Sequence, residues 1–180
     1  MITIRHEKLA DIDAREALLD DAFGDARTRK SSERLREGRL PADGLSFIAA
    51  EGKRVVGTAR LWHVACDGPE ALLLGPVAVA AERRGAGIGA ALVRRAVSEA
   101  KRRGHGAVIL VGDAPYYGRF GFTAAKTGAL WMPGPFERHR LLARELVKGA
   151  LDGAQGILRA TGTAAVTPEL AALGLPAHAA

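Results

Sequence analysis

The sequence contains one cysteine, Cys66, and no apolar run long enough to cross a membrane. A single cysteine excludes an internal disulfide and favours a reducing compartment, and in a strand-like run it is typical of a core residue. The longest apolar run, residues 71–81, is about half of the roughly 20 residues that a membrane helix needs. The first residues also lack the apolar stretch of a secretory signal. We therefore expect a cytoplasmic protein with no membrane association.

Aromatic residues are scarce, at 5 % of the chain. Binding of single-stranded nucleic acid by stacking requires aromatic side chains interleaved with basic ones, and the sequence has no such pattern. We therefore expect no nucleic-acid partner. The formal charge of +6 instead favours an anionic ligand. Many of the basic residues lie in residues 27–39, where acids and bases are mixed, and we interpret this segment as a solvated surface helix.

Hydrophobic residues make up 48 % of the chain and charged residues 26 %, which is typical of a globular protein, and 180 residues fit one domain. Periodicity predicts, in order, a strand at 2–6, a helix at 9–23, an antiparallel strand pair within 45–66, a buried strand at 71–81, a helix at 88–103 and a second buried strand at 107–113. The last three elements form a parallel crossover unit. Further elements are a strand near residue 121, a strand or helix at 141–146 and a strand at 156–160. We assign residues 1–160 to one domain and residues 161–180 to a weakly patterned, Ala-rich tail.

The first buried strand contains Gly75 followed by Pro76. Proline does not donate a hydrogen bond to a sheet, and glycine within a strand often marks a bulge. We therefore expect the strand to be interrupted at this step, which leaves backbone groups free for a ligand.

The segment RRGAGIG, residues 83–89, places three glycines at the start of the following helix. A nucleotide P-loop is excluded because no Gly-Lys-Ser/Thr follows. Gly85 and Gly87 begin a match to a dinucleotide fingerprint, with Asp113 as the ribose-binding acid, but the match does not start directly after the strand. A dinucleotide-binding oxidoreductase therefore stays a remote alternative. In the third interpretation, free N–H groups at the helix start bind a pyrophosphate, and Arg84 adds a full charge.

Two motifs resemble those of a known family. VAVAAERRGAGIGAALV resembles the acetyl-CoA-binding segment of the GNAT-type N-acetyltransferases, whose pattern Gln/Arg-x-x-Gly-x-Gly/Ala is matched by Arg84, Gly87 and Gly89. YYGRFGF, residues 116–122, resembles the family's Tyr-x-x-x-Gly-Phe segment. The resemblance implies an α/β (α+β) fold: a single GNAT-like domain with a mixed central sheet of about six or seven strands flanked by helices. In this fold two central parallel strands splay apart.

The resemblance also implies the activity, which is direct transfer of an acetyl group from acetyl-CoA to an amine, with no metal. The residues implied to bind acetyl-CoA are Val77 and Val79 through their backbones, Arg84, Gly85, Ala86, Gly87, Ile88 and Gly89 at the pyrophosphate, and Asp113 near the pantetheine. Tyr117 is implied to be the general acid that protonates the CoA thiolate. A sensor or assembly module that binds CoA and transfers nothing remains an alternative.

The general base and the acceptor are less defined. Family members often use a carboxylate on the central strand, but residues 72–80 contain no acid. Candidates without a spacing argument are Glu51, His63 and Glu70, and we favour a base that acts through water. The acceptor is expected to be a small-molecule or peptide amine. Its pocket has as candidate lining residues Trp62, His63, Trp131 and Met132, which are equally typical of core packing. A homodimer is a family-level expectation.

Overall fold

The computed structural model describes residues 1–166, except for the side chain of Asp25. Within this range the strands are β1 (Ile2–His6), β2 (Ser46–Glu51), β3 (Arg54–Asp67), β4 (Glu70–Val79), β5 (Ala107–Val111), β6 (Leu130–Trp131), β7 (Leu141–Glu145) and β8 (Gln155–Ala160). The α-helices are α1 (Ile12–Phe23), α2 (Ile88–Arg102) and α3 (Ala114–Gly118). Short 3-10 helices are η1 (Leu9–Asp11), η2 (Gly24–Arg29), η3 (Glu33–Leu35), η4 (Ala81–Arg83) and η5 (Arg138–Arg140).

The described strands form one eight-stranded sheet in the order β1-β2-β3-β4-β5-β7, with β8 paired to β3 and β6. Its pairs are antiparallel apart from β4–β5 and β6–β8. The mixed sheet and the β4–α2–β5 crossover are thereby confirmed. The sheet exceeds the expected six or seven strands because β6 has only two residues and so carries no alternation. Near residue 121 no strand forms, and Thr123 makes only an isolated bridge to Ala143.

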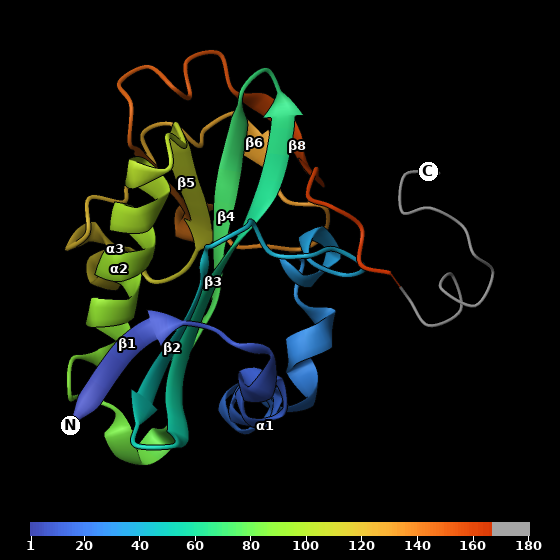
Figure 1. Cartoon of the computed structure of the whole chain (residues 1–180). Helices are drawn as coiled ribbons and strands as arrows, with labels where there is room; N and C mark the ends of the chain where they lie inside the picture. The colour runs from blue at the N-terminus through green and yellow to red at the C-terminus, as the bar shows by residue number, and fades with distance from the viewer. Residues whose placement is uncertain (167–180) are drawn as a thin grey trace.

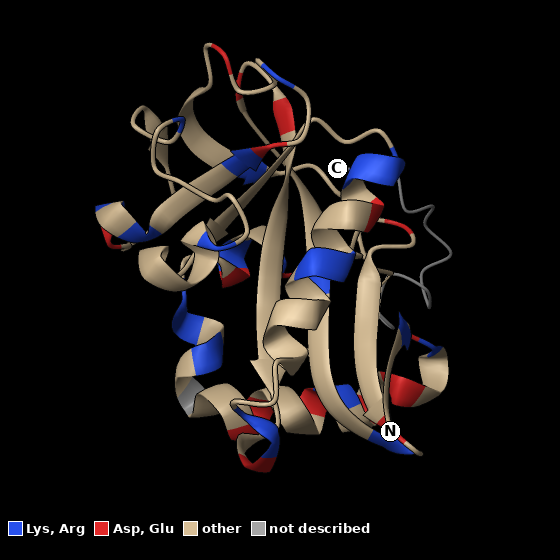
Figure 2. Ribbon diagram, turned by 90° about the vertical axis from the view of Figure 1, so that its left-hand side faces the viewer, with Lys and Arg blue, Asp and Glu red and all other residues tan. Residues whose placement is uncertain are grey.

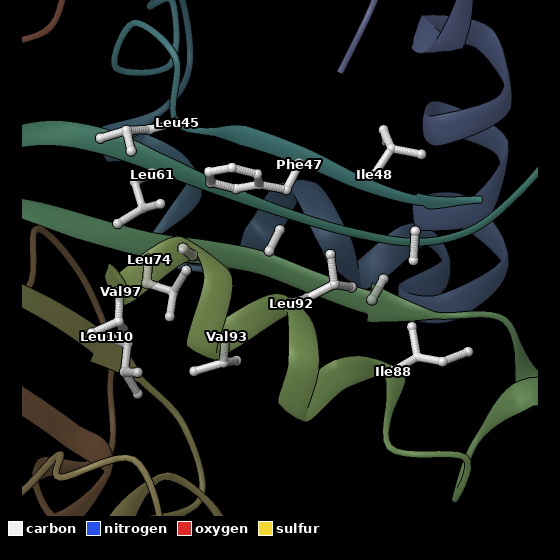
Figure 3. Packing of buried hydrophobic residues seen from close by; sticks show 14 of the residues in the cluster. Leu45, Phe47, Ile48, Leu61, Leu74, Ile88, Leu92, Val93, Val97 and Leu110 are labelled. Carbon is white, nitrogen blue, oxygen red and sulfur yellow. The ribbon is translucent and has the colours of Figure 1, made fainter. Parts of the chain in front are cut away.

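Helices α1 and α2 lie on opposite sides of the sheet (Figure 1). The apolar side chains of α2, among them Leu92, are buried against β2, β3 and β4 (Figure 3). Gly57 in β3 makes room for this helix, because a Cβ there would lie 2.9 Å from Cδ1 of Leu92. The opposite face of α2 carries exposed basic residues, including Arg94 and Arg95 (Figure 2). α2 is therefore amphipathic, as its sequence predicts.

The central strand β4 is covered on both faces. Leu72 and Leu74 belong to the core that contains the buried apolar residues of α2, whereas Leu73 belongs to a second core formed with β6, β7 and β8. Successive side chains of a strand point to opposite faces, so a strand buried on both sides has a continuous apolar sequence. This explains the long apolar run that the sequence shows at β4.

The predicted boundary between a domain at 1–160 and a tail at 161–180 stays a prediction. Residues 167–180 lie outside the described residues. Just before them, Thr161 donates its N–H to His63, and Leu40 donates its N–H to Thr163. Among residues 1–166, no helix has the length and apolar character needed to cross a membrane.

Candidate active site

The site is positioned by a gap between the two central parallel strands. β4 and β5 pair only at Leu72 with Val108 and at Leu73 with Ile109. Beyond this point β4 continues alone on that side, and its pairing with β3 shifts register opposite Gly75, whose φ is 138°. The predicted interruption is therefore present, and the strands splay apart as the resemblance implies.

The bulge in β4 is stabilised by a hydrogen bond from a buried indole on β3. Trp62 on β3 is 5 % exposed and donates its Nε1–H to the carbonyl oxygen of Gly75 at 2.6 Å. A buried indole N–H needs an acceptor, and the bulge supplies one. Trp62 therefore fixes the bulge, and it is a core residue and does not line the cavity described below.

The free edge of β4 offers backbone groups to the gap. Ala80 donates its N–H to the carbonyl of Val56 on β3 at 3.0 Å. Backbone groups of successive extended residues point to opposite sides, so Val79 and Val77 direct their N–H and C=O groups away from β3. That side faces the gap left by β5. The geometry supports the roles predicted for Val77 and Val79.

The glycine turn between β4 and α2 is open. Gly87 is the N-cap of α2 in the left-handed region, with φ 78°, and Gly85 has φ 84°. A Cβ added at either glycine would meet no atom within 4 Å. Among the described residues the N–H groups of Gly85 and Gly87 have no acceptor, and the first N–H groups of α2 have none within the helix. These donors lie at the positive end of the helix dipole, which suits an anion.

Two arginines precede the turn, and only one of them forms an ion pair within the described residues. Arg83 pairs with Glu51, with 2.5 Å between Nη2 and Oε2. Arg84 is exposed and has no ion-pair partner in the described part of the chain. Arg84 is therefore the one whose guanidinium group is not engaged in an ion pair, and its role at a phosphate stays a prediction. On the far side of the turn, a Cβ at Gly89 would lie 3.1 Å from the hydroxyl of Tyr116, so this phenol reaches the turn.

Tyr117 is held at the end of β5 by helix α3. The carboxylate of Asp113 accepts the N–H of Tyr116 at 3.1 Å and so caps α3. The ring of Tyr117 lies on Gly112, where a Cβ would come within 2.6 Å of Cδ2 and closer still to Cε2. Burial raises the pKa of Tyr117 to about 12; neighbouring Tyr116 adds to the rise and the charge of Arg140 opposes it.

A cavity of about 710 Å³ lies at the gap, between the bulge of β4 and Tyr117. It is bounded by the β4 bulge from Leu73 to Val77, the end of β5 from Val111 to Asp113, and Tyr117. Two further walls come from residues 23–36 and from residues 135–140. A volume of this size fits a small-molecule site.

The walls of this cavity correct two expectations. Residues 27–39 are not a solvated surface helix: η2 and η3 lie within or next to this segment, and Arg27, Lys30 and Arg36 line the cavity. The candidate acceptor residues His63, Trp131 and Met132 do not line it.

The candidate bases are also placed elsewhere. Neither Glu51, His63 nor Glu70 lines the cavity, whose carboxylates are Asp113 and Glu137. Glu137, like Gly112 and Arg140, was missed because nothing in its local sequence marks it. Its place at the cavity comes from the loop that precedes β7.

The free edge of β4, the unpaired N–H donors at the start of α2 and the half-buried phenol at the gap are together the features expected of an acyltransferase that binds a CoA thioester. A family model described as an acetyltransferase (GNAT) domain matches residues 3–125. The chain belongs to this family. It is an N-acetyltransferase whose cosubstrate is acetyl-CoA. The antiparallel majority of its sheet also excludes the doubly wound dinucleotide fold.

Relatives match over most of the chain. An uncharacterised N-acetyltransferase of Escherichia coli K12, YhbS, is 30 % identical over 157 residues, which cover 86 % of this chain and 93 % of YhbS. The crystal structure of E. coli YhbS in complex with CoA has a TM-score of 0.75, 28 % identity, and coverage of 88 % of this chain and 89 % of that one. A GNAT acetyltransferase of Brucella melitensis in complex with acetyl-CoA has a TM-score of 0.68, 26 % identity, and coverage of 88 % and 95 %.

Proposed function

We propose that Tyr117 is the general acid of direct acetyl transfer from acetyl-CoA to an amine bound in the 710 Å³ cavity. The observation that carries this proposal is that the phenol of Tyr117 and the bulge of β4 face the same cavity. When bound, the thioester supplies an electrophilic carbonyl carbon, with which the amine forms a C–N bond as the C–S bond breaks.

The glycine turn and the edge of β4 fit acetyl-CoA. We assign the pyrophosphate to residues 85–89, with Arg84 adding charge. The N–H groups of Gly85, Gly87, Ile88 and Gly89 are the donors, because that of Ala86 donates to the carbonyl of Arg83 at 3.4 Å. Val77 and Val79 hydrogen-bond the pantetheine amides as a neighbouring strand would. Asp113, which caps α3 at the cavity edge, is assigned to the pantetheine end. The missing Cβ atoms at Gly85 and Gly87 support this fit because they leave the turn open.

The raised pKa of Tyr117 defines how it acts. Burial keeps the phenol protonated throughout the neutral range, which is the form a general acid needs. A pKa of about 12 lies roughly 3.5 units above the reference pKa of a thiol. Full proton transfer from Tyr117 to a thiolate with that reference pKa would therefore cost about 5 kcal/mol. Burial in the gap also raises the pKa of the CoA thiol, which narrows the difference between the pKa values of the phenol and the thiol. Tyr117 therefore first stabilises the developing thiolate by a hydrogen bond, and its proton follows as the C–S bond breaks.

The proton of the attacking amine is assigned to water. β4 contains no acid between residues 72 and 80, and the carboxylates of Glu51 and Glu70 do not reach the cavity. Glu137 lines the cavity but its side chain is 62 % exposed, so it is in contact with solvent. These placements support a water-relayed base.

Tyr117→Phe tests the assignment, because it removes the hydroxyl and keeps the ring. We expect kcat for CoA release with a reactive amine to fall by about 10²–10⁴-fold, the range of general acid catalysis. The dissociation constant of acetyl-CoA, measured by calorimetry, should stay within about twofold. Equal kcat in Tyr117→Phe and wild type would remove Tyr117 from the chemistry. Acetyl-CoA binding without CoA release for any amine would favour a sensor.

Partners and location complete the proposal. We assign the acceptor to small-molecule or peptide amines and the protein to the cytoplasm, which the buried free thiol of Cys66 supports. A homodimer is supported by Trp131 and Ile157, register partners on β6 and β8 that are 52 % and 55 % exposed. Sedimentation velocity at micromolar concentration tests the homodimer.

A further inference from the structure

The cavity is lined by basic side chains from two separate segments. Arg27, Lys30 and Arg36 come from the segment after α1, and Arg140 comes from the loop before β7. Arg27 is neutralised from outside the cavity by Glu16 and by Asp20, the latter at 2.7 Å. The other three basic residues are less fully paired.

Arg36 is buried, with 8 % of its side chain exposed. Its Nε and Nη2 bind Glu33, at 3.2 and 2.7 Å. Nη1 has no hydrogen-bond partner among the described residues, and it lies 3.4 Å from the position a Cβ would take at Gly75. A buried guanidinium group needs its donors satisfied. Arg36 therefore presents to the cavity, at the bulge of β4, one N–H donor group that has no hydrogen-bond partner among the described residues.

Arg36 and Arg140 both lie near enough to Lys30 to act on its charge. The pKa of Lys30 is lowered, first by burial and then by the charges of Arg36 and Arg140. No acidic side chain in the described part of the chain pairs with Lys30, whose Nζ lies 4.2 Å from the ring centroid of Phe23. Arg140 has only a 3.4 Å contact with the exposed Glu137. Three incompletely compensated cations thus meet in one cavity.

We propose that the acceptor is a small amine that also carries an anionic group, a carboxylate or a phosphate, and that Arg36, Lys30 and Arg140 bind this group. The inference rests on the proposed function, because it names the acceptor of that site. Cationic side chains bind such oxygens through charge-assisted hydrogen bonds. They also disfavour a bound ammonium, so the amine is presented in its neutral, nucleophilic form. Polyamines and other polycations are excluded as acceptors.

The transfer balances with this acceptor. The neutral amine forms the C–N bond and the C–S bond breaks. The extra proton on nitrogen passes to water, the thiolate takes the proton of Tyr117, and the Tyr117 phenolate then regains a proton from water. The anionic group stays bound and unchanged, so the product is an N-acetylated anion plus CoA.

A binding experiment tests the anion site without requiring transfer. Protein saturated with CoA, which occupies the glycine turn, is titrated by calorimetry with glutarate, with inorganic phosphate and with neutral glutaramide. Glutarate or phosphate should bind, and glutaramide should bind at least about tenfold more weakly. The anion with the lower dissociation constant shows whether the site recognises a carboxylate or a phosphate.

Variants locate the site. Lys30→Gln and Arg140→Gln should each weaken binding of that anion by about tenfold or more, since a hydrogen bond to a charged group contributes about that factor. Lys101→Gln is the matched control, because Lys101 is an exposed lysine on α2 away from the cavity. These variants avoid the buried Arg36, whose loss threatens folding. Equal binding in all variants, or no binding of either anion, overturns the inference.

A turnover experiment separates this inference from the proposed function. CoA release is compared for 4-aminobutyrate with butylamine, for 2-aminoethyl phosphate with ethanolamine, and for spermidine. At least tenfold higher kcat/KM for one anionic amine over its neutral partner is expected. Equal or faster turnover of butylamine or spermidine overturns the anionic acceptor but supports acetyl transfer. If no amine releases CoA, the proposed function fails, and the calorimetric titration still decides whether the cavity binds an anion.

Discussion

Gly112→Ala tests whether the placement of Tyr117 controls catalysis. Gly112 directly follows β5, and its φ lies outside the left-handed region, so alanine is compatible with the backbone. The change leaves intact the N–H of Gly112, which binds the carbonyl of Arg140 at 2.9 Å. Its effect therefore acts on the ring of Tyr117.

The size of the effect follows from the geometry. A Cβ at Gly112 would lie 2.6 Å from Cδ2 of Tyr117, whereas carbon atoms pack at about 3.5–4.0 Å. The ring must therefore shift by about 1 Å. A misplacement of this size costs on the order of 10²-fold in rate, or about 2.7 kcal/mol of activation free energy. We expect kcat to fall by that factor while the dissociation constant of acetyl-CoA changes little.

The assay is CoA release, followed with a thiol reagent at saturating acetyl-CoA. Gly118→Ala is the matched control, because Gly118 lies in the same short helix as Tyr117 and a Cβ there would meet no atom within 4 Å. It should retain wild-type kcat. The reasoning fails if Gly112→Ala, folded and binding acetyl-CoA, keeps kcat within threefold of Gly118→Ala.

Two further outcomes are expected. Gly87→Ala should weaken acetyl-CoA binding by about tenfold in a calorimetric titration. A Cβ on a left-handed residue costs about 1–2 kcal/mol, which the free turn relieves by changing its conformation and the bound turn does not. An unchanged dissociation constant would show that the turn does not bind the ligand. The pKa of Asp11 is lowered to about 2, chiefly by its hydrogen bonds to Arg5, so its stabilising effect is present above about pH 4 and is lost as pH falls toward 2. Asp11→Asn should therefore lower the free energy of unfolding in urea at pH 7, with the difference from wild type shrinking between pH 5 and pH 2. A difference independent of pH would contradict this.

The central part of the fold was predictable because its signals are local. The alternation of residues 2–6, the continuous apolar run of β4 and the helical periodicity of α2 each depend on neighbours along the chain. The glycine turn carries its signal in the same way, because left-handed positions favour glycine. The sequence therefore placed the turn at the start of α2 and the interruption in β4.

The walls of the cavity had no comparable signal. Arg36 belongs to a charged segment, and mixed charges are usually solvated. Its burial depends on a pair with Glu33 and on the approach of this segment to Gly75, which lies far away in the sequence. Gly112 and Arg140 meet only because β7 pairs with β5. Such contacts depend on tertiary structure, which sequence periodicity does not report.

The missing carboxylate on β4 and the basic side chains that line the cavity are physically connected. The central strand has no carboxylate to accept the proton of the amine, and the segment expected at the surface instead brings Lys30 and Arg36 to the cavity. Cations lower the pKa of a carboxylate placed beside them and so weaken it as a base, whereas they favour the loss of a proton from a nearby ammonium to water, which gives the neutral amine. The basic lining therefore gives a physical reason for the proposed water-relayed base. In the acceptor that we propose, the anionic group of the amine compensates those cations.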